Sequence, residues 1–493
     1  MSTTQNRVLI CILLVLALIN AALYLTLAGE PGFPLDDAWI HQTFARNLGQ
    51  HGQFAFNPGE RSSGSTSPGW TVLLAGGYAL GAPPLPWALI WGSLFSILAA
   101  WLAAQLSSRY FHCTPAAFLV AIICMLDWRL TWAALSGMEI SLFITLTMLY
   151  LLLIDRDASP VWLGLLAGLI FTVRPEGLLL AATYFLRFLP LRRSALKPLL
   201  QAAGLFALTF MLVAGPLLAA NLFLGGRLFP NTVYAKYLAW TYPWTAEKGL
   251  RYLGETLVYF VVGPQLFIAP FAALPLVKPA RGAREPVRYA LLWFAALVLL
   301  YALALPVIYH HGRYLMPLIP VVTLFGVEGL RRVAEKFSHW RILKIAYPLA
   351  AGTLLIAFWI NGAKTYALQT QLLNANHAQV AFWLKDHTPD NTVVAAHDIG
   401  LLGYYSGRPI VDLAGLITPE ILPILFEPTA IADLMAERGV EYLVVFRGYY
   451  DPLIDLLDAE VIYAPPGTDR LLSLGAAPIE VYSFPTTGRQ TAR

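Results

Sequence analysis

The sequence has few charged residues. They make up 13% of its 493 residues, whereas apolar residues make up 58% and the mean hydropathy is +0.61. Soluble domains are about half apolar and about a quarter charged, so a chain with this composition cannot cover a surface that faces water. The composition therefore excludes a soluble enzyme, a disordered protein and a nucleic-acid-binding protein. It indicates a membrane protein that has membrane lipids, and no nucleic acid, among its partners.

Cysteines and internal repeats are also scarce. The three cysteines, Cys11, Cys113 and Cys124, lie in apolar stretches or at their edges, so they form no disulfide framework. The sequence has no internal repeat and no low-complexity linker. Because many transporters are built from repeats, this lack counts against a transporter.

The charges that are present divide the chain in two. Residues 362–493 hold 15 Asp and Glu against 8 Lys and Arg, whereas residues 1–361 hold 14 against 25. We expect a basic membrane domain at 1–361, whose first outer loop (29–85) carries juxtamembrane helices. An acidic domain of ordinary composition is expected at 362–493.

The apolar stretches predict a polytopic α-helical membrane protein with about eleven transmembrane helices, since one helix needs roughly 20 apolar residues. The segment 160–189 is divided into two short helices, because Arg174 and Pro175 interrupt it. The expected spans lie near 8–28, 86–107, 115–134, 138–154, 160–172, 176–189, 199–224, 254–277, 287–308, 314–330 and 342–361.

The segment 69–82 is too short to span comfortably, so we expect it to be re-entrant or interfacial. With the N-terminus in the cytoplasm, this choice places 12 of the 33 basic residues in three short cytoplasmic loops, at 192–197, 278–288 and 331–344. Counting 69–82 as a span would reverse that arrangement. The polar motifs and the C-terminal domain are therefore expected on the extracytoplasmic side.

The C-terminal domain has the pattern of an α/β fold. A helical stretch at 374–388 precedes a β run at 392–396, and a second β run follows at 409–413. Helical stretches at 419–437 lead to a third β run at 442–446. Strands that alternate with helices predict a small, mostly parallel sheet.

Two adjacent carboxylates, Asp36 and Asp37, follow the first span and precede an apolar stripe at helical spacing between Trp39 and Leu48. One of them could simply cap this helix, but one helix needs only one cap. A carboxylate in a sheltered cleft at the membrane surface could have a raised pKa and act as a general base.

Several motifs, taken in order along the chain, resemble those of the C-type glycosyltransferases. These are polytopic bacterial enzymes whose donor is a sugar linked to polyprenyl phosphate, and the group with the mycobacterial terminal arabinofuranosyltransferases is the most similar. The motifs are DDAWI (36–40), HGQFAFNPGE (51–60), TSPGW (66–70), SGME (136–139), RPEG (174–177), PNTVYAK (230–236), GRYLMP (312–317) and HDIGLLGYYSGRPIVDLAGL (397–416). Trp39 stands where this family usually has Tyr, and Ser62–Ser65 replace a charged, aromatic stretch.

The resemblance implies an inverting sugar transfer in which Asp36 is the catalytic base and Asp37 supports it. Cations must hold the phosphate of the donor, and the candidates are Arg174, Lys236, His310, His311 and Arg313. Further expected contacts with substrate are Glu139, Glu176, Asn57, Glu60, Tyr234, His397 and Asp398. No cofactor is required, although a divalent cation could bind at Asp36 and Asp37.

Several of these residues have plainer alternatives. Arg174 could only pair with Glu139 or Glu176, Lys236 could be a solvated loop cation, and Arg313 could be an interfacial residue. For His397 and Asp398, structural hydrogen bonding is the alternative to acceptor contact.

The expected enzyme lies in the bacterial plasma membrane and transfers the sugar, on the outer face, to a hydroxyl of an envelope glycan, lipid or protein. Two other classes of protein remain open: a transporter or flippase of envelope precursors, and a non-catalytic assembly scaffold. The acid pair discriminates between them, because only an enzyme needs Asp36 for turnover.

Overall fold

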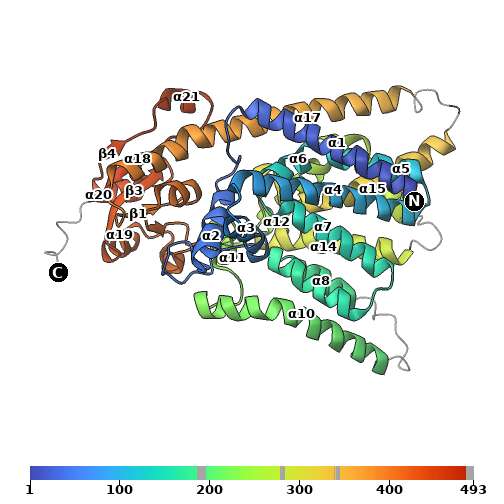
Figure 1. The fold of residues 1–493 in the computed structure, drawn as a ribbon, viewed down its shortest axis with the longest axis horizontal. Coiled ribbons are helices and arrows are strands. Elements are labelled where there is room, and N and C mark those ends of the chain that lie inside the picture. The colour runs from blue at the N-terminus through green and yellow to red at the C-terminus, as the bar shows by residue number, and fades with distance from the viewer. Residues whose placement is uncertain (186–195, 262, 278–283, 338, 340–344, 485–493) are drawn as a thin grey trace. The chain divides into compact units, whose positions relative to one another are not determined.

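The computed structural model describes residues 1–185, 196–261, 263–277, 284–337, 339 and 345–484 (Figure 1). The chain forms two compact units. Unit 1 comprises residues 1–27, 88–217 and 240–365, and unit 2 comprises 28–87, 218–239 and 366–493. The first outer loop and the C-terminal domain thus belong to the same unit.

Unit 1 is helical, and several of its helices continue into unit 2. Its described helices of 8 residues or more are α1 (Thr3–Ala28), α4 (Pro84–Phe111), α5 (Thr114–Leu126), α6 (Trp128–Leu135), α7 (Ile140–Asp155), α8 (Pro160–Val173), α9 (Gly177–Phe185), α10 (Leu196–Gly225), α12 (Ala246–Val261), α14 (Arg284–Ala304), α15 (Ile319–Lys336) and α17 (Ala346–Leu373).

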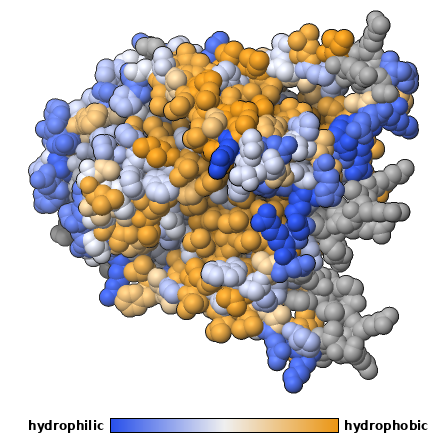
Figure 2. All heavy atoms as spheres, turned by 45° about the vertical axis from the view of Figure 1, so that its right-hand side comes forward, coloured by the Kyte–Doolittle hydropathy of each residue, from blue (hydrophilic) through white to orange (hydrophobic). Residues whose placement is uncertain are grey.

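Among the described residues, five helices are long and apolar enough to cross a membrane, or six if the bent pair α5 and α6 is one span. Large apolar side chains on these and neighbouring helices are exposed, among them Leu18, Leu208, Leu257 and Leu349, each about 70% accessible. Figure 2 shows hydrophobic side chains over much of the visible surface. Exposed apolar surface of this extent needs lipid, so the chain is a polytopic membrane protein.

Two of the expected spans are not single straight helices. The helix expected at 115–134 bends by 58° between α5 and α6. There the carboxylate of Asp127 accepts hydrogen bonds from the backbone amides of Arg129 and Leu130 and so starts a new helix. The helix expected at 254–277 ends at Val261, and short 3₁₀ turns and α13 (Ala273–Val277) replace its second half.

Prolines explain the second interruption. Pro264, Pro270 and Pro275 all fall in this stretch, and a proline inside a helix removes a hydrogen-bond donor and clashes with the preceding turn.

Half of the twelve basic residues used to orient the chain lie outside the described residues, namely Arg192, Arg193, Lys278, Arg281, Arg341 and Lys344. For Arg284 and Arg288, in the described helix α14, no side-chain position is described either.

Unit 2 contains a five-stranded sheet with the order β2-β1-β3-β5-β4. Its strands are β1 (Val393–Ala396), β2 (Ile410–Asp412), β3 (Val440–Phe446), β4 (Val461–Tyr463) and β5 (Ile479–Ser483). The first three strands are parallel, with Ala395 opposite Val411 and Leu443. The expected parallel sheet is therefore present, and β5 and β4 extend it with antiparallel pairings that were not predicted.

Helices cover both faces of this sheet (Figure 1). One face packs on α19 (Pro428–Glu437) and α20 (Asp451–Leu457) through Ile431, Met435 and Leu453. The other face packs on α18 (Gln379–His387), which follows a π-helical turn at Asn374–Ala378. Ile40 and Phe44 belong to the same apolar cluster as α18.

Ile40 and Phe44 come from the first outer loop, where α2 (Asp37–His51) packs against α3 (Pro68–Ala79). The 12 residues of α3 reach roughly 18 Å, whereas the hydrocarbon core of a bilayer is about 30 Å thick. This length accords with a segment that does not span. The loop and the C-terminal domain share one apolar core, and this shared core positions the acid pair.

Candidate active site

Asp36 lies at the start of α2 and is 9% accessible. It occupies the N-cap position of that helix, but its side chain makes no capping hydrogen bond there. Instead, its two carboxylate oxygens accept hydrogen bonds from the backbone amides of Gly400 and Leu401, each at 2.7 Å. These amides begin the helical turn that follows β1, where a carboxylate is stabilised by the helix dipole.

Gly400 makes this contact possible. A Cβ atom at position 400 would lie 2.1 Å from the backbone oxygen of Asp36 and 2.7 Å from its Oδ2. Only a residue without a side chain can bring its backbone amide this close to the carboxylate.

Two further ionisable groups, Asp398 and His377, influence Asp36. Burial raises the pKa of the Asp36 carboxyl to about 6, and the charge of Asp398 adds to this rise. Nε2 of His377 lies 2.9 Å from Oδ2 of Asp398. Burial lowers the pKa of His377, but the hydrogen bond to Asp398 and the charges of both carboxylates raise it overall. For Asp398, burial raises the pKa, but the hydrogen bond and the charge of His377 lower the pKa overall.

Asp37 has a different environment from Asp36. Its side chain is 34% accessible, and one of its oxygens lies 4.0 Å from Nζ of Lys236. Lys236 ends α11 (Asn231–Lys236), so the structure brings the DDAWI and PNTVYAK motifs together. Asp36 is thus enclosed by the C-terminal domain, whereas Asp37 lies beside a cation at a partly open surface.

Of the other predicted residues in the first outer loop, Asn57 attaches the loop to the C-terminal domain. The side-chain amide of Asn57 accepts from the backbone amide of Ile410 at 3.0 Å and donates to its carbonyl at 2.9 Å. It therefore pairs with the edge strand β2 as another strand would. Nδ2 of Asn57 also donates to Glu60. Tyr234 lies under the guanidinium of Arg227, whose Cζ is 4.6 Å from the ring centre.

The C-terminal domain supplies His397 beside Asp398. Nδ1 of His397 lies 2.7 Å from the Tyr450 hydroxyl, and its Nε2 lies 3.9 Å from Oδ1 of Asp398. Asp412, at the end of β2, accepts hydrogen bonds from the backbone amides of three residues in the following loop, Ala414, Leu416 and Ile417. Asp412 therefore shapes that loop.

A second cluster, in unit 1, is formed by three motifs that are distant in sequence. The guanidinium of Arg174 donates to Glu139 and to Glu176, each at 2.8 Å, and to the Tyr301 hydroxyl at 3.2 Å. Arg174 is 5% accessible, and Glu139 is 3% accessible. Two carboxylates thus neutralise this arginine, which corresponds to the ion-pair alternative open from the sequence.

Arg313 belongs to the same cluster. It donates to the hydroxyls of Tyr309 and Tyr314 at 3.0 and 3.4 Å. The Tyr314 ring lies against both arginines, 4.9 Å from Cζ of Arg174 and 5.2 Å from that of Arg313.

His310 and His311 have backbone φ angles of 47° and 60°. Residues other than glycine adopt this left-handed conformation at a cost, and such residues are concentrated at functional sites. The ring of His311 contacts Trp128 and Trp132 edge-on.

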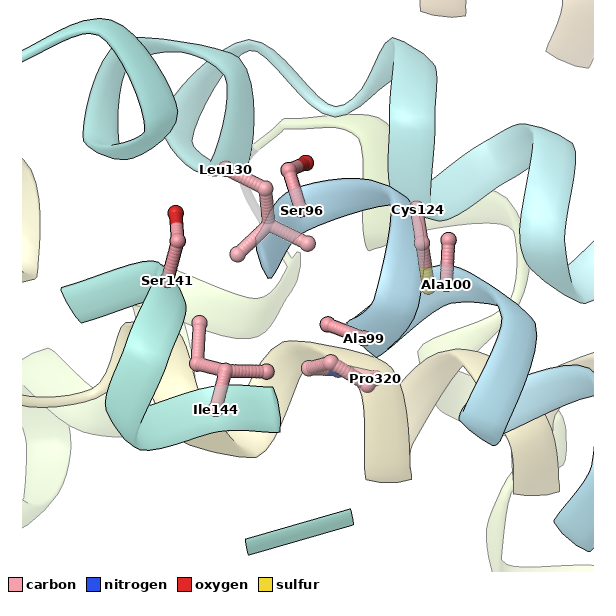
Figure 3. A pocket seen from close by; sticks show the side chains of 8 residues that line it. All are labelled: Ser96, Ala99, Ala100, Cys124, Leu130, Ser141, Ile144 and Pro320. Carbon is pink, nitrogen blue, oxygen red and sulfur yellow. The ribbon is translucent and has the colours of Figure 1, made fainter. Parts of the chain in front are cut away.

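Unit 1 also contains a small cavity, of about 10 Å³, between α4, α5, α6, α7 and the start of α15 (Figure 3). It has room for about one water molecule. Its lining is mostly apolar, with the hydroxyls of Ser96 and Ser141 as polar groups, so it is a packing void and too small for a sugar.

Among the described residues, no three His, Cys, Asp or Glu side chains are grouped so that they could hold a metal ion. The carboxylates of Asp36 and Asp37 could contribute oxygen ligands to a divalent cation.

Sequence reasoning missed three residues near the predicted ones: His377, Tyr301 and Tyr450. Tyr450 follows β3, and the rule that ligands bind at the carboxyl ends of parallel strands could have identified it. No sequence signal distinguishes His377 or Tyr301 from ordinary residues of an amphipathic helix.

Comparisons with known proteins concern the fold. A family model described as a domain of unknown function (DUF8728) matches residues 363–482. No curated protein sequence matches the chain significantly. Among solved structures, ArnT from Cupriavidus metallidurans bound to undecaprenyl phosphate is 13% identical, with a TM-score of 0.60 over 97% of this chain and 99% of that chain. Its apo state gives a TM-score of 0.58 at 14% identity, with the same coverage of both chains.

The archaeal oligosaccharyltransferase AglB from Archaeoglobus fulgidus, in complex with an inhibitory peptide and a dolichol-phosphate, also resembles the chain. It is 14% identical, with a TM-score of 0.58 over 90% of this chain and 70% of that chain. The chain has the GT-C fold. The resemblance inferred from the motifs is thereby confirmed at the level of the fold.

Within the GT-C fold, this chain brings its predicted residues into two groups. Asp36, Asp37, Lys236, His397 and Asp398 lie in unit 2. Arg174, Glu139, Glu176 and Arg313 lie in unit 1.

Proposed function

We propose that this GT-C protein is an inverting glycosyltransferase that moves a sugar from a polyprenyl-phosphate donor to an acceptor hydroxyl. The observation that carries the proposal is the buried carboxylate of Asp36, which the backbone amides of the C-terminal domain fix next to the pair of Asp37 and Lys236. A rigid carboxylate with a pKa near 6 suits a general base at neutral pH.

In the proposed reaction, Asp36 removes the proton of the acceptor hydroxyl while the acceptor oxygen bonds to the anomeric carbon. The bond from that carbon to the phosphate oxygen breaks, and polyprenyl phosphate leaves with the electron pair. One displacement inverts the anomeric configuration. Polyprenyl phosphate is a stable anion, so no strong acid is needed. A divalent cation at Asp36 and Asp37 is not required, although it could help to neutralise the phosphate.

We assign phosphate binding to Lys236 in unit 2, beside Asp37, and Arg313, His310 and His311 in unit 1 remain candidates from their motifs. Arginine and lysine both bind phosphate through charge-assisted hydrogen bonds. Arg174 is the least suited of the five predicted cations, since its guanidinium already donates to two carboxylates. We assign Arg174 to positioning of the cluster instead. The acceptor is a glycan, lipid or protein of the cell envelope.

We further propose eleven spans in a bacterial plasma membrane, with the N-terminus in the cytoplasm and the C-terminal domain outside. The basic loops at 192–197, 278–288 and 331–344 support this orientation.

The test is sugar transfer by the purified protein in nanodiscs from a panel of polyprenyl-phosphate hexoses and pentoses, with and without EDTA. We expect one donor to be consumed by the wild type and not by Asp36→Asn. A reaction that survives EDTA dispenses with a divalent metal ion.

A transporter or flippase would leave all donors intact and instead move one of them across a proteoliposome bilayer. A scaffold would do neither, and Asp36→Asn would then have no catalytic effect.

A further inference from the structure

Unit 2 has a cavity of about 280 Å³ at the carboxyl ends of its three parallel strands. His397 follows β1, Ala414 follows β2, and Tyr449 and Tyr450 follow β3, and all four line the cavity. Open α/β sheets bind ligands at this edge, where the loops after parallel strands meet. The volume is close to the lower end of small-molecule sites, roughly 300 Å³, which suits a compact ligand.

The lining combines exposed aromatic rings with a few polar groups. Tyr449 is 61% accessible and Phe426 is 69% accessible, although both are large and largely apolar. The Tyr449 and Tyr450 rings lie 5.4 Å apart, and His397 lies 5.3 Å from Tyr449. Such rings offer flat apolar surface together with hydroxyls and an imidazole that can hydrogen-bond.

This chemistry matches a sugar ring. A pyranose or furanose has a face of C–H groups that packs on an aromatic ring, and hydroxyls around its edge that need donors and acceptors. A lipid chain would gain nothing from His397 and Tyr450, which already form a polar pair at 2.7 Å.

Two residues that line the cavity are close in sequence to residues that act on the acid pair. His397 lines the cavity and is bonded in sequence to Asp398, whose carboxylate raises the pKa of Asp36. Ala239, another lining residue, comes three positions after Lys236, the partner of Asp37.

We propose that this cavity binds the sugar of a glycan acceptor, with Tyr449 as the stacking platform. That the bound sugar belongs to the acceptor rests on the proposed function, but sugar binding at this cavity can be measured without any turnover. It names the acceptor class, a glycan, in preference to a lipid or a protein.

The binding test uses the full-length protein in nanodiscs and saturation-transfer NMR with the methyl glycosides of glucose, galactose, mannose and arabinofuranose. We expect signals from at least one glycoside. They should be lost in Tyr449→Ala, kept in Tyr449→Phe, and kept in Phe382→Ala. Phe382 is a matched control, because it is 42% accessible in the same unit and does not line the cavity.

The kinetic test follows if a donor is identified. Tyr449→Ala should raise the KM for the glycan acceptor about tenfold, which is the loss of one aromatic contact. The KM for the donor and the rate of donor hydrolysis should not change.

The outcomes separate this proposal from the proposed function. Glycoside binding that depends on Tyr449, without consumption of any donor, overturns the transferase and retains the sugar site. Absence of binding by every glycoside, or an acceptor KM that Tyr449→Ala leaves unchanged, overturns the sugar site. Transfer to a lipid or peptide hydroxyl only, with no glycan accepted, also overturns it.

Discussion

At the scale of single residues, the two adjacent aspartates differ in what holds them. Asp36 is buried and accepts hydrogen bonds from two backbone amides, whereas Asp37 is one-third accessible and lies beside Lys236. From the sequence, either aspartate could cap the following helix or act as the catalytic base. The capping alternative takes an unexpected form, because the Asp36 carboxylate caps the helical turn after β1 and makes no capping hydrogen bond to its own helix.

The two aspartates should respond differently to the same substitution. Asp36→Asn removes the general base, so kcat should fall by about 10²- to 10⁴-fold. An asparagine NH₂ group would also face a backbone amide and leave it without an acceptor, which costs about 1–3 kcal/mol and lowers the melting temperature. Asp37→Asn removes a partly exposed ion pair and should lower kcat no more than about fivefold, with little change in melting temperature.

Measuring kcat and the melting temperature of the two variants in parallel checks this difference. A larger loss of kcat in Asp37→Asn than in Asp36→Asn would transfer the role of base to Asp37.

The pKa of Asp36 predicts how activity depends on pH. A base works only when it is ionised, so kcat/KM should fall as the pH drops through about 6 and reach a plateau above it. The hydrogen bond between His377 and Asp398 raises the pKa of His377 and lowers the pKa of Asp398, so it favours the charged form of both groups near Asp36. The pH profile of kcat/KM for the wild type measures the midpoint of this fall. An acid limb near the ordinary aspartate pKa of about 4 would contradict the buried base.

Arg174 and its two carboxylates make a prediction about stability. Breaking a buried ion pair by removing one partner costs about 3–5 kcal/mol, so Arg174→Leu should lower the melting temperature in detergent strongly. The matched control is Arg251→Leu, because Arg251 pairs with Glu255 on an exposed helix face and should contribute no more than about 1 kcal/mol. Equal effects of the two substitutions would contradict the cluster.

At the scale of elements, the strands β1, β2 and β3 and most helices follow from periodicity and composition. The strands β4 and β5 do not, because β4 is three residues long and largely exposed, so it has no hydrophobic alternation. The joining of the first outer loop to the C-terminal domain is also invisible in the sequence. It depends on hydrogen bonds between residues more than 350 positions apart, such as the two between Asn57 and Ile410.

The turn after β1 gives the sharpest prediction at this scale. Gly400→Ala would place a methyl group against Asp36, and overpacking of this kind typically costs about 1–3 kcal/mol. It should therefore lower both the melting temperature and kcat. Gly76→Ala is the control, since nothing lies within 4 Å of its added Cβ in helix α3. If both variants melt together with the wild type, the close contact of Gly400 with Asp36 is absent.

At the scale of the whole molecule, composition and motif order predict the class of protein and its fold. The GT-C likeness extends over 97% of the chain at only 13% identity, because the fold requires apolar helices and a few polar positions, and little else of the sequence. The roles of single residues do not follow in the same way. From the sequence, Arg174 could bind phosphate or pair with Glu139 or Glu176, and only the positions of these side chains show that both carboxylates bind it.

The central claim is a single displacement at the anomeric carbon of a polyprenyl-phosphate sugar, with an aspartate as the base. The most direct measurement is the anomeric configuration of the product, determined by NMR after transfer from a donor of known configuration. We predict that the configuration is inverted and that one polyprenyl phosphate is released per sugar transferred. A product that retains the configuration of the donor, or a donor that the protein does not consume, would contradict the account.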